Sequence, residues 1–359
     1  MTKIAARKGM PDVHLSKDEF DRRFRNRFFD PAFDKNEAAL AGIIETAWTG
    51  YDEYRKNPRK VPAGAEFSKP DDKLPIEWLK TRSRIKDAEA RQKNPQSPPR
   101  ILLINGSMRS NQSCPGEISK SWRLLQLAKE IIDGEGKFEV EILDLSRLTS
   151  EYGRNIHPCK SCVSTAMPLC HWPCSCYPNF AMGQVSDWMN EIYPMWVAAH
   201  GVMIVTPVNW YQAPSGLKCM IDRLVCADGG NPDPTTTDGK DPELAKDLEM
   251  KGWDYPRHLE GRLFSVVVHG DTAGVETLRR SLADWLADIG MIQAGHGAVL
   301  DRYIGYFGTY AENHIHLDED TAIQEEVRNA ARALAEAVTL MRAGNFRQPD
   351  ANLHEVRPK

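Results

Sequence analysis

The chain has 359 residues, of which 41% are hydrophobic and 27% charged, and its formal net charge is −4. This balance gives no argument for nucleic acid or for an anionic membrane surface as a partner. The first eight residues carry charge with no apolar stretch behind them, and no run approaches the roughly 18 apolar residues that a membrane span needs. We therefore expect a cytoplasmic protein with no nucleic-acid partner and no membrane partner.

The first hundred residues differ in pattern from the rest. Apolar residues recur at helical spacing between Leu40 and Tyr51, which predicts an amphipathic helix over about 36–54. Before it, arginines alternate with phenylalanines over 22–29, which favours a solvated helical face over an anionic contact site. Proline and charge dominate 57–73, which indicates an irregular arm, and a second helix is expected over about 76–92. We interpret this region as an extension that wraps a partner subunit or the chain's own body.

From residue 100 onward, short apolar runs alternate with helical stretches. Continuous apolar strands separated by helices indicate a parallel sheet that is covered on both faces. Five such strands suit a flavodoxin-like order, 2-1-3-4-5, in which ligands bind beyond the carboxyl ends of the strands. The runs that predict strands lie at 101–104, 138–143, 202–205 and 263–269 and within 291–300.

These patterns predict an α/β fold with three parts. A doubly wound, five-stranded parallel sheet forms the domain over 99–344. A helical and irregular N-terminal extension occupies 1–98, and a C-terminal tail occupies 345–359. The long stretch 228–257 interrupts the α/β pattern, and an insertion of this length more often forms a lid or a subunit contact than an open docking face.

The loop after the first predicted strand has the composition of a phosphate-binding loop. It contains Gly106-Ser107-Met108-Arg109-Ser110 and leads toward a predicted helix at about 119–132. Backbone N–H groups, the helix dipole, serine hydroxyls and an arginine can all donate hydrogen bonds to a phosphate there. Alone this loop is a weak signal, and its position after an apolar strand strengthens it.

Further segments, in order and each on the expected element, make a family resemblance specific. The chain resembles the NAD(P)H-dependent FMN reductase family, and within it the flavodoxin-like proteins related to iron–sulfur flavoproteins, over about 100–300. The matching segments are Ile104-Asn105-Gly106-Ser107-Met108-Arg109, Asp144-Leu145-Ser146, Pro158-Cys159-Lys160-Ser161-Cys162, Thr206-Pro207-Val208-Asn209-Trp210, Gly216-Leu217-Lys218-Cys219-Met220-Ile221-Asp222-Arg223 and His269-Gly270-Asp271.

The resemblance implies an FMN-dependent oxidoreductase that passes electrons from NAD(P)H to a small acceptor such as a quinone or a flavin. An FMN electron carrier that serves a protein partner is the alternative, and a scaffold that has lost its flavin is a third. Because the flavin itself carries the redox chemistry, we assign no catalytic acid or base. The resemblance also implies a homodimer or homotetramer, with the N-terminal extension as a plausible clasp.

The resemblance further implies which loops hold FMN. The first loop and the start of the next helix would bind the phosphate, the second loop would pass along the isoalloxazine, and the third would face its pyrimidine side. Relatives usually have tyrosine where this chain has Asn209, so the aromatic contact is expected from Trp210 or Tyr211. The predicted cofactor residues are Ser107, Arg109, Ser119, Lys120, Ser121, Pro207, Val208, Asn209, Trp210, Tyr211, His269, Gly270, Asp271 and Gly274.

Five of the eight cysteines fall within eighteen residues: Cys159, Cys162, Cys170, Cys174 and Cys176. In a chain with no export signal, such a cluster favours a metal, a redox thiol or a packed thiol-rich loop over a disulfide scaffold. Cys159 and Cys162 match the start of the iron–sulfur flavoprotein motif, while the later spacing departs from it. A [4Fe–4S] cluster is the first expectation and structural zinc the second, with His171 as a further candidate ligand. A reduced, packed loop remains the alternative.

Overall fold

The computed structural model describes residues 5–254 and 257–347, and these fall into two compact units. The first, here called the three-segment unit, contains 5–82, 157–187 and 229–254. The second, the sheet unit, contains 83–156, 188–228 and 257–347. The predicted boundary lay at residues 98–99, and two stretches assigned to the α/β domain, 157–187 and 229–254, belong instead to the three-segment unit. The predicted tail at 345–359 lies mostly outside the described residues.

A parallel sheet forms the centre of the sheet unit, and its order confirms the predicted 2-1-3-4-5 topology. β3 lies between β4 and β5, β5 pairs with β6, and all of these pairs are parallel. The predicted fifth strand is two short strands, because the backbone turns away at Gly295 and resumes beside the second half of β6. The strands are β3 (Arg100–Asn105), β4 (Glu139–Asp144), β5 (Gly201–Pro207), β6 (Leu263–Gly270), β7 (Ile292–Gln293) and β8 (Val299–Tyr303).

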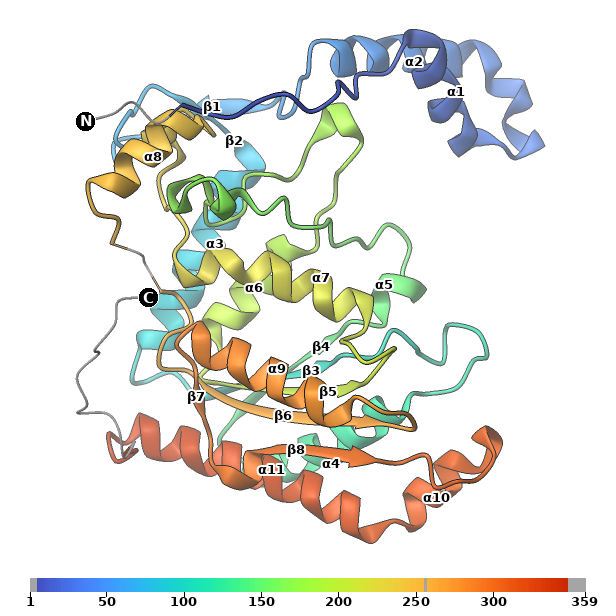
Figure 1. The fold of residues 1–359 in the computed structure, drawn as a ribbon, viewed down its shortest axis with the longest axis vertical. Helices are drawn as coiled ribbons and strands as arrows, with labels where there is room; N and C mark the ends of the chain where they lie inside the picture. The colour runs from blue at the N-terminus through green and yellow to red at the C-terminus, as the bar shows by residue number, and fades with distance from the viewer. Residues whose placement is uncertain (1–4, 255–256, 348–359) are drawn as a thin grey trace. The chain divides into compact units, whose positions relative to one another are not determined.

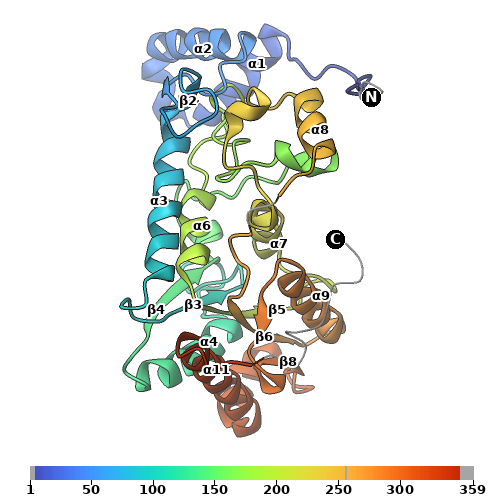
Figure 2. The same cartoon turned by 90° about the vertical axis from the view of Figure 1, so that its left-hand side faces the viewer.

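Helices cover both faces of this sheet, as its continuous apolar strands require. Helices α4 (Lys120–Gly134) and α11 (Thr321–Arg342) lie on one face, and α6 (Met189–Ala198), α7 (Ser215–Arg223) and α9 (Val275–Asp288) on the other (Figures 1 and 2). Two short helices, α5 (Arg147–Ser150) and α10 (Asn313–Glu319), complete this unit. The start of α4 is set by Ser119, whose hydroxyl accepts a hydrogen bond from the Trp122 N–H.

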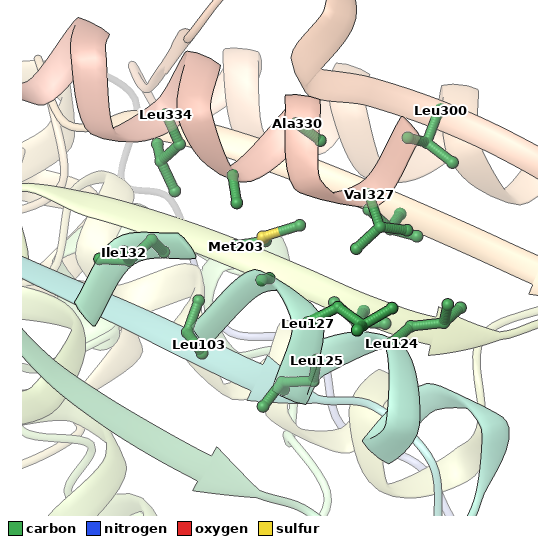
Figure 3. Close-up of a cluster of buried hydrophobic side chains, with 14 of the residues drawn as sticks. Leu103, Leu124, Leu125, Leu127, Ile132, Met203, Leu300, Val327, Ala330 and Leu334 are labelled. Carbon is green, nitrogen blue, oxygen red and sulfur yellow. The ribbon is translucent and has the colours of Figure 1, made fainter. Parts of the chain in front are cut away.

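The core beneath the sheet joins α4 and α11 to the central strands. Figure 3 shows Val327, Ala330 and Leu334 of α11 directed toward Met203 of β5 and toward the leucines of α4. These side chains are fully buried, and burial of each large one stabilises the fold by about 1.5–3 kcal/mol. Alternation of Leu, Ile and Ala at helical spacing in 321–342 produces this face.

The three-segment unit has shorter elements. α1 (Lys17–Arg25) confirms the predicted helical face in the arginine-rich stretch, and α2 (Glu37–Asp52) is the predicted amphipathic helix. The stretch predicted to be irregular contains an antiparallel pair, β1 (Lys60–Pro62) and β2 (Lys73–Pro75), which leads into α3 (Ile76–Lys93). α8 (Pro242–Met250) is a helix that the pattern did not predict. Among the described residues, no helix is both long and apolar enough to cross a bilayer.

Candidate functional site

A pocket of about 740 Å³ opens at the carboxyl ends of β3, β5 and β6 in the sheet unit. This volume suits a cofactor-sized ligand. Most of the predicted cofactor residues line it: Ser107, Arg109, Ser119, Lys120, Ser121, Pro207, Val208, Asn209, His269, Gly270 and Asp271. The parallel order explains this convergence, because it places the loops after neighbouring strands at the same edge of the sheet. The loops that the sequence singled out separately therefore form one site.

One end of the pocket has the features of an anion site. The fifteen-residue helix α4 begins there, and its free N–H groups and dipole favour negative charge. The Ser107 hydroxyl accepts from the Arg109 N–H at 3.1 Å, which fixes the turn of the first loop. Arg109 forms an ion pair with Glu117, yet its buried Nε has no partner among the described residues. Burial lowers the pKa of Lys120, with Arg109 acting in the same direction.

The His269 ring joins the third loop to α4. Its Nε2 lies 2.7 Å from the hydroxyl of Ser121, and both side chains are buried. Burial lowers the pKa of His269 to about 3, with a smaller contribution from Lys120, so the ring is neutral at pH 7. Its Nδ1 has no hydrogen-bond partner in the described part of the chain. A buried polar atom left in this state indicates that something else satisfies it.

Two glycines are required by the close approach of the loops. A Cβ at Gly106 would lie 2.5 Å from Oγ1 of Thr206, and one at Gly270 would lie 2.5 Å from Cγ1 of Val208. Real side chains do not approach so closely, so any larger residue must push these loops apart. The two glycines thus permit the close approach of these loops at the edge of the sheet, beside the pocket.

The second loop brings only part of its predicted residues into the pocket lining. Asn209 and Gln212 exchange backbone hydrogen bonds of 2.9 and 3.0 Å, so Trp210 and Tyr211 form a two-residue turn. Both have left-handed φ values, 47° and 66°, which is uncommon for bulky residues. Trp210 is 91% exposed, and neither aromatic lines the pocket. The structure thus places both aromatic side chains at the surface, outside the lining of the pocket.

Gly274 is the third predicted residue that lies outside the lining of the pocket. It precedes α9 with φ of 105° and does not line the pocket. A Cβ there would lie 2.8 Å from Cα of Tyr211. The absence of a side chain at Gly274 therefore permits the turn of the second loop to approach the start of α9.

One wall of the pocket was not predicted. It comes from the segment before and at the start of α10, with Tyr310, Ala311, Asn313 and His314 in the lining. His314 Nε2 lies 3.0 Å from the carbonyl of Ile118, which ties this segment to the inserted first loop. The buried Oδ1 of Asn313 has no partner among the described residues. The sequence offered one signal for this wall, the polar pair Asn313-His314, and this pair belongs to no periodic pattern.

The cysteine segment lies in the three-segment unit. The sulfurs of Cys162 and Cys176 are 3.6 Å apart, and Nζ of Lys240 lies 3.0 Å from the first and 3.1 Å from the second. The hydrogen bond with Cys176 and the charge of Lys240 outweigh burial and lower the pKa of Cys162 to about 6. Burial opposes the charge on Lys240, but the thiols, Cys176 foremost, raise its pKa. Cys162 and Cys176 therefore form a thiol pair with the partly buried ammonium group of Lys240 against it, and Cys174 lies near enough for its charge to act on Lys240 and on Cys162.

This arrangement does not fit the predicted metal site. Within the described residues, no three histidine, cysteine, aspartate or glutamate side chains are placed to hold a metal ion. The amine of Lys240 is in contact with the sulfurs of both Cys162 and Cys176. His171 is also engaged, because its Nδ1 lies 2.6 Å from the Ser175 hydroxyl and its Nε2 lies 3.1 Å from that of Thr237. The geometry therefore supports neither a [4Fe–4S] cluster nor structural zinc here.

The sheet order and the pocket define a class. A doubly wound parallel sheet with a pocket and a helix N-terminus at the carboxyl ends of its central strands defines a flavodoxin-like α/β protein. The sequence profile of the NADPH-dependent FMN reductase family matches residues 99–304, more than half of the chain. The chain belongs to this family of flavin-dependent oxidoreductases, as the resemblance predicted.

Individual relatives are distant. The chain is 25% identical over 242 residues to an iron–sulfur flavoprotein from Methanosarcina thermophila, covering 67% of this chain and 96% of that one. Among solved structures, RosB with a bound formylated riboflavin phosphate has a TM-score of 0.47 at 15% identity, covering 73% of this chain and 95% of RosB. An NAD(P)H:quinone oxidoreductase from Methanothermobacter marburgensis has a TM-score of 0.40 at 14% identity, covering 66% and 98%.

Proposed function

We propose that this chain is an FMN-dependent oxidoreductase that takes electrons from NAD(P)H and passes them to a small acceptor such as a quinone or a flavin. The observation that carries the proposal is a set of three buried polar atoms with no partner among the described residues. They are Nε of Arg109, Nδ1 of His269 and Oδ1 of Asn313, and all three residues line one pocket. Three such atoms on separate segments around one pocket are what a site for a single polar ligand requires.

The residues present fit FMN. The phosphate would lie at the start of α4, where the backbone N–H groups, Ser107 and Arg109 can donate to it. Ser121 sits in the first turn of that helix, and its bond to His269 fixes the orientation of both side chains. When bound, the flavin accepts a hydride and releases electrons singly or in pairs. The chain's own contribution is to bind and orient it, and to keep His269 neutral so that its free ring nitrogen can hydrogen-bond to the ligand.

The test begins with the protein loaded with FMN under anaerobic conditions. We expect a stoichiometric complex whose visible flavin bands bleach on addition of NADH or NADPH and return on addition of a quinone. His269→Gln should weaken FMN binding, while Lys218→Gln, which removes an exposed lysine paired with Asp222 on α7, should leave it unchanged. A chain that rejects FMN contradicts the proposal. A complex that binds FMN but is not reduced by NAD(P)H supports the electron-carrier alternative instead.

We also propose that the chain forms a homodimer or homotetramer through its N-terminal extension. Met10, Val13 and Phe29 are almost fully exposed apolar residues in this stretch, and Phe29 is 88% exposed. Exposed apolar groups gathered in one segment favour a protein contact. Phe29→Glu should lower the mass measured by light scattering, whereas the control Tyr152→Glu, at a fully exposed site of the sheet unit, should not. An unchanged mass in both variants contradicts the role of the extension.

A further inference from the structure

Two stretches outside the α/β pattern, 157–187 and 229–254, meet in the three-segment unit. The backbone N–H of Asn231 donates to the carbonyl of Cys170 at 2.5 Å, and the N–H of Trp172 donates back to the carbonyl of Asn231 at 3.1 Å. The Asn231 side chain also donates to the carbonyl of Pro168. This pairing brings Lys240, just before α8, against sulfurs that are 78 and 64 residues away in sequence.

The frame around the thiol pair is fixed. His171 is fully buried and bonded on both sides, to Ser175 and to Thr237. Nζ of Lys56 donates to the carbonyl of Ser175 at 2.5 Å, which places a second lysine beside Cys176. The backbone adjoining Cys176 is therefore held from two directions. A fixed thiol pair beside two partly buried lysines is an electropositive setting in which sulfur is nucleophilic.

The two sulfurs differ in access. Cys176 is 4% exposed, whereas Cys162, at the start of the short helix Cys162–Ser164, is half-buried. A reagent from solvent can reach Cys162 first. The buried Cys176 sulfur, 3.6 Å away, is positioned to react with the Cys162 sulfur after that sulfur has been modified.

We propose that Cys162 and Cys176 are a redox-active dithiol that reduces a small hydroperoxide and closes as a disulfide, with Lys240 as its positioning cation. The Cys162 sulfur attacks the peroxide oxygen, so that an S–O bond forms, the O–O bond breaks, and the thiol proton leaves with the alcohol or water released. Cys176 then attacks the oxidised sulfur; the S–S bond forms, and the hydroxyl leaves with the second thiol proton as water. Two thiols and one hydroperoxide give one disulfide, one alcohol or water, and one further water.

This proposal is independent of the flavin site, because it uses only residues of the three-segment unit. Lys240 lies against both sulfurs, so its charge stabilises the negative charge that each sulfur carries as it attacks. A small hydroperoxide is the substrate class, because the attacking Cys162 is itself only partly exposed and its partner Cys176 is buried.

The experiment uses the full chain, reduced and freed of reductant without air, and adds one equivalent of hydrogen peroxide. We expect the thiol count to fall by two from the eight cysteines of the chain and mass spectrometry to find Cys162 linked to Cys176. In Cys176→Ser the reaction should stop at the sulfenic acid of Cys162, which dimedone labels. In Cys162→Ser neither the sulfenic acid nor the disulfide should form. The control Cys114→Ser removes an exposed cysteine of the sheet unit and should still form the disulfide.

The role of Lys240 is tested by comparing two lysine variants. Lys240→Met should slow disulfide formation about tenfold, the effect expected when one charge-assisted contact is lost. Lys251→Met, just beyond the same helix α8, should leave the rate unchanged, and circular dichroism checks that both variants fold. Unchanged thiols in the wild type, or loss of other cysteines in place of this pair, overturns the proposal. So does iron or zinc that remains with the purified chain until Cys162 and Cys176 are both replaced.

Discussion

The two compact units of this chain are stabilised in different ways. In the sheet unit, β5 and β6 are almost entirely buried, and α4 and α11 pack their apolar faces against them. In the three-segment unit, regular elements are short, and the segments are joined by side chains that bond to distant backbone, such as Trp78 to the carbonyl of Pro173. This difference accounts for the kind of site on each unit: a pocket on the sheet unit and a thiol pair on the three-segment unit. A buried sheet holds several loops at a fixed edge, whereas crossing loops bring single side chains together.

The largest expected effect tests burial in the sheet unit. Leu334→Ala removes a fully buried side chain from the contact between α11 and the strands. The lost burial and the cavity left behind should lower the free energy of unfolding by about 2–5 kcal/mol. Leu340→Ala, on the same helix at a partly exposed position, should lower the free energy of unfolding by well under half as much. Urea denaturation measures both, and equal effects would contradict the proposed source of stability.

Acid should weaken the sheet unit through His269. Its pKa falls from 6.5 in the unfolded chain to about 3 in the folded one, so the stability linked to the neutral ring is complete above pH 6.5 and is lost as the pH falls toward 3. At pH 5 the loss is roughly 2 kcal/mol. His269→Gln removes this proton uptake, so its unfolding free energy should fall less between pH 7.5 and 5 than that of the wild type.

His200 and His258 provide the internal control for that experiment. Burial lowers the pKa of each to about 4, and both remain in the variant, so some acid sensitivity must persist. If His269→Gln and the wild type show the same dependence between pH 7.5 and 5, the ring of His269 is not buried in its neutral form.

The smallest expected effect concerns the three-segment unit. Trp78→Phe keeps a large buried ring but removes the N–H that donates to the carbonyl of Pro173 at 2.7 Å. The carbonyl then loses a buried partner, and the unit should lose about 1–2 kcal/mol. Hydrogen exchange should rise in 165–176 and not in β5 or β6. Faster exchange in the sheet strands would contradict the division into two units.

The sequence could predict the sheet unit well because its signals are local. Each apolar run is a strand, each run ends at a polar or glycine-rich loop, and parallel order alone brings Ser107, Asn209 and His269 to one edge. The turn at Trp210 could not be predicted, since its left-handed backbone depends on the hydrogen bonds of its neighbours. The wall at Asn313 depends on how the chain returns after β8, which no periodicity encodes.

The helices of the three-segment unit could be predicted, but the contacts between its segments could not, for a different physical reason. The cysteine spacing indicated a metal site, because closely spaced thiols are its usual sequence sign. The decisive residue, Lys240, lies in an insertion whose composition gave no sign of contact with the cysteines. Such contacts between distant segments depend on tertiary packing, and only the folded chain shows a lysine against the two sulfurs.

We propose that FMN binds where the loops after β3, β5 and β6 meet. A titration of FMN fluorescence against protein tests this binding most directly. The wild type should bind one FMN per chain. Gly106→Ala, whose Cβ would lie 2.5 Å from Thr206, should weaken binding about a hundredfold or more, whereas Gly297→Ala, with open space around its Cβ, should bind as the wild type does. Equal FMN binding by Gly106→Ala and wild type, or none by the wild type, would contradict the assignment of this pocket.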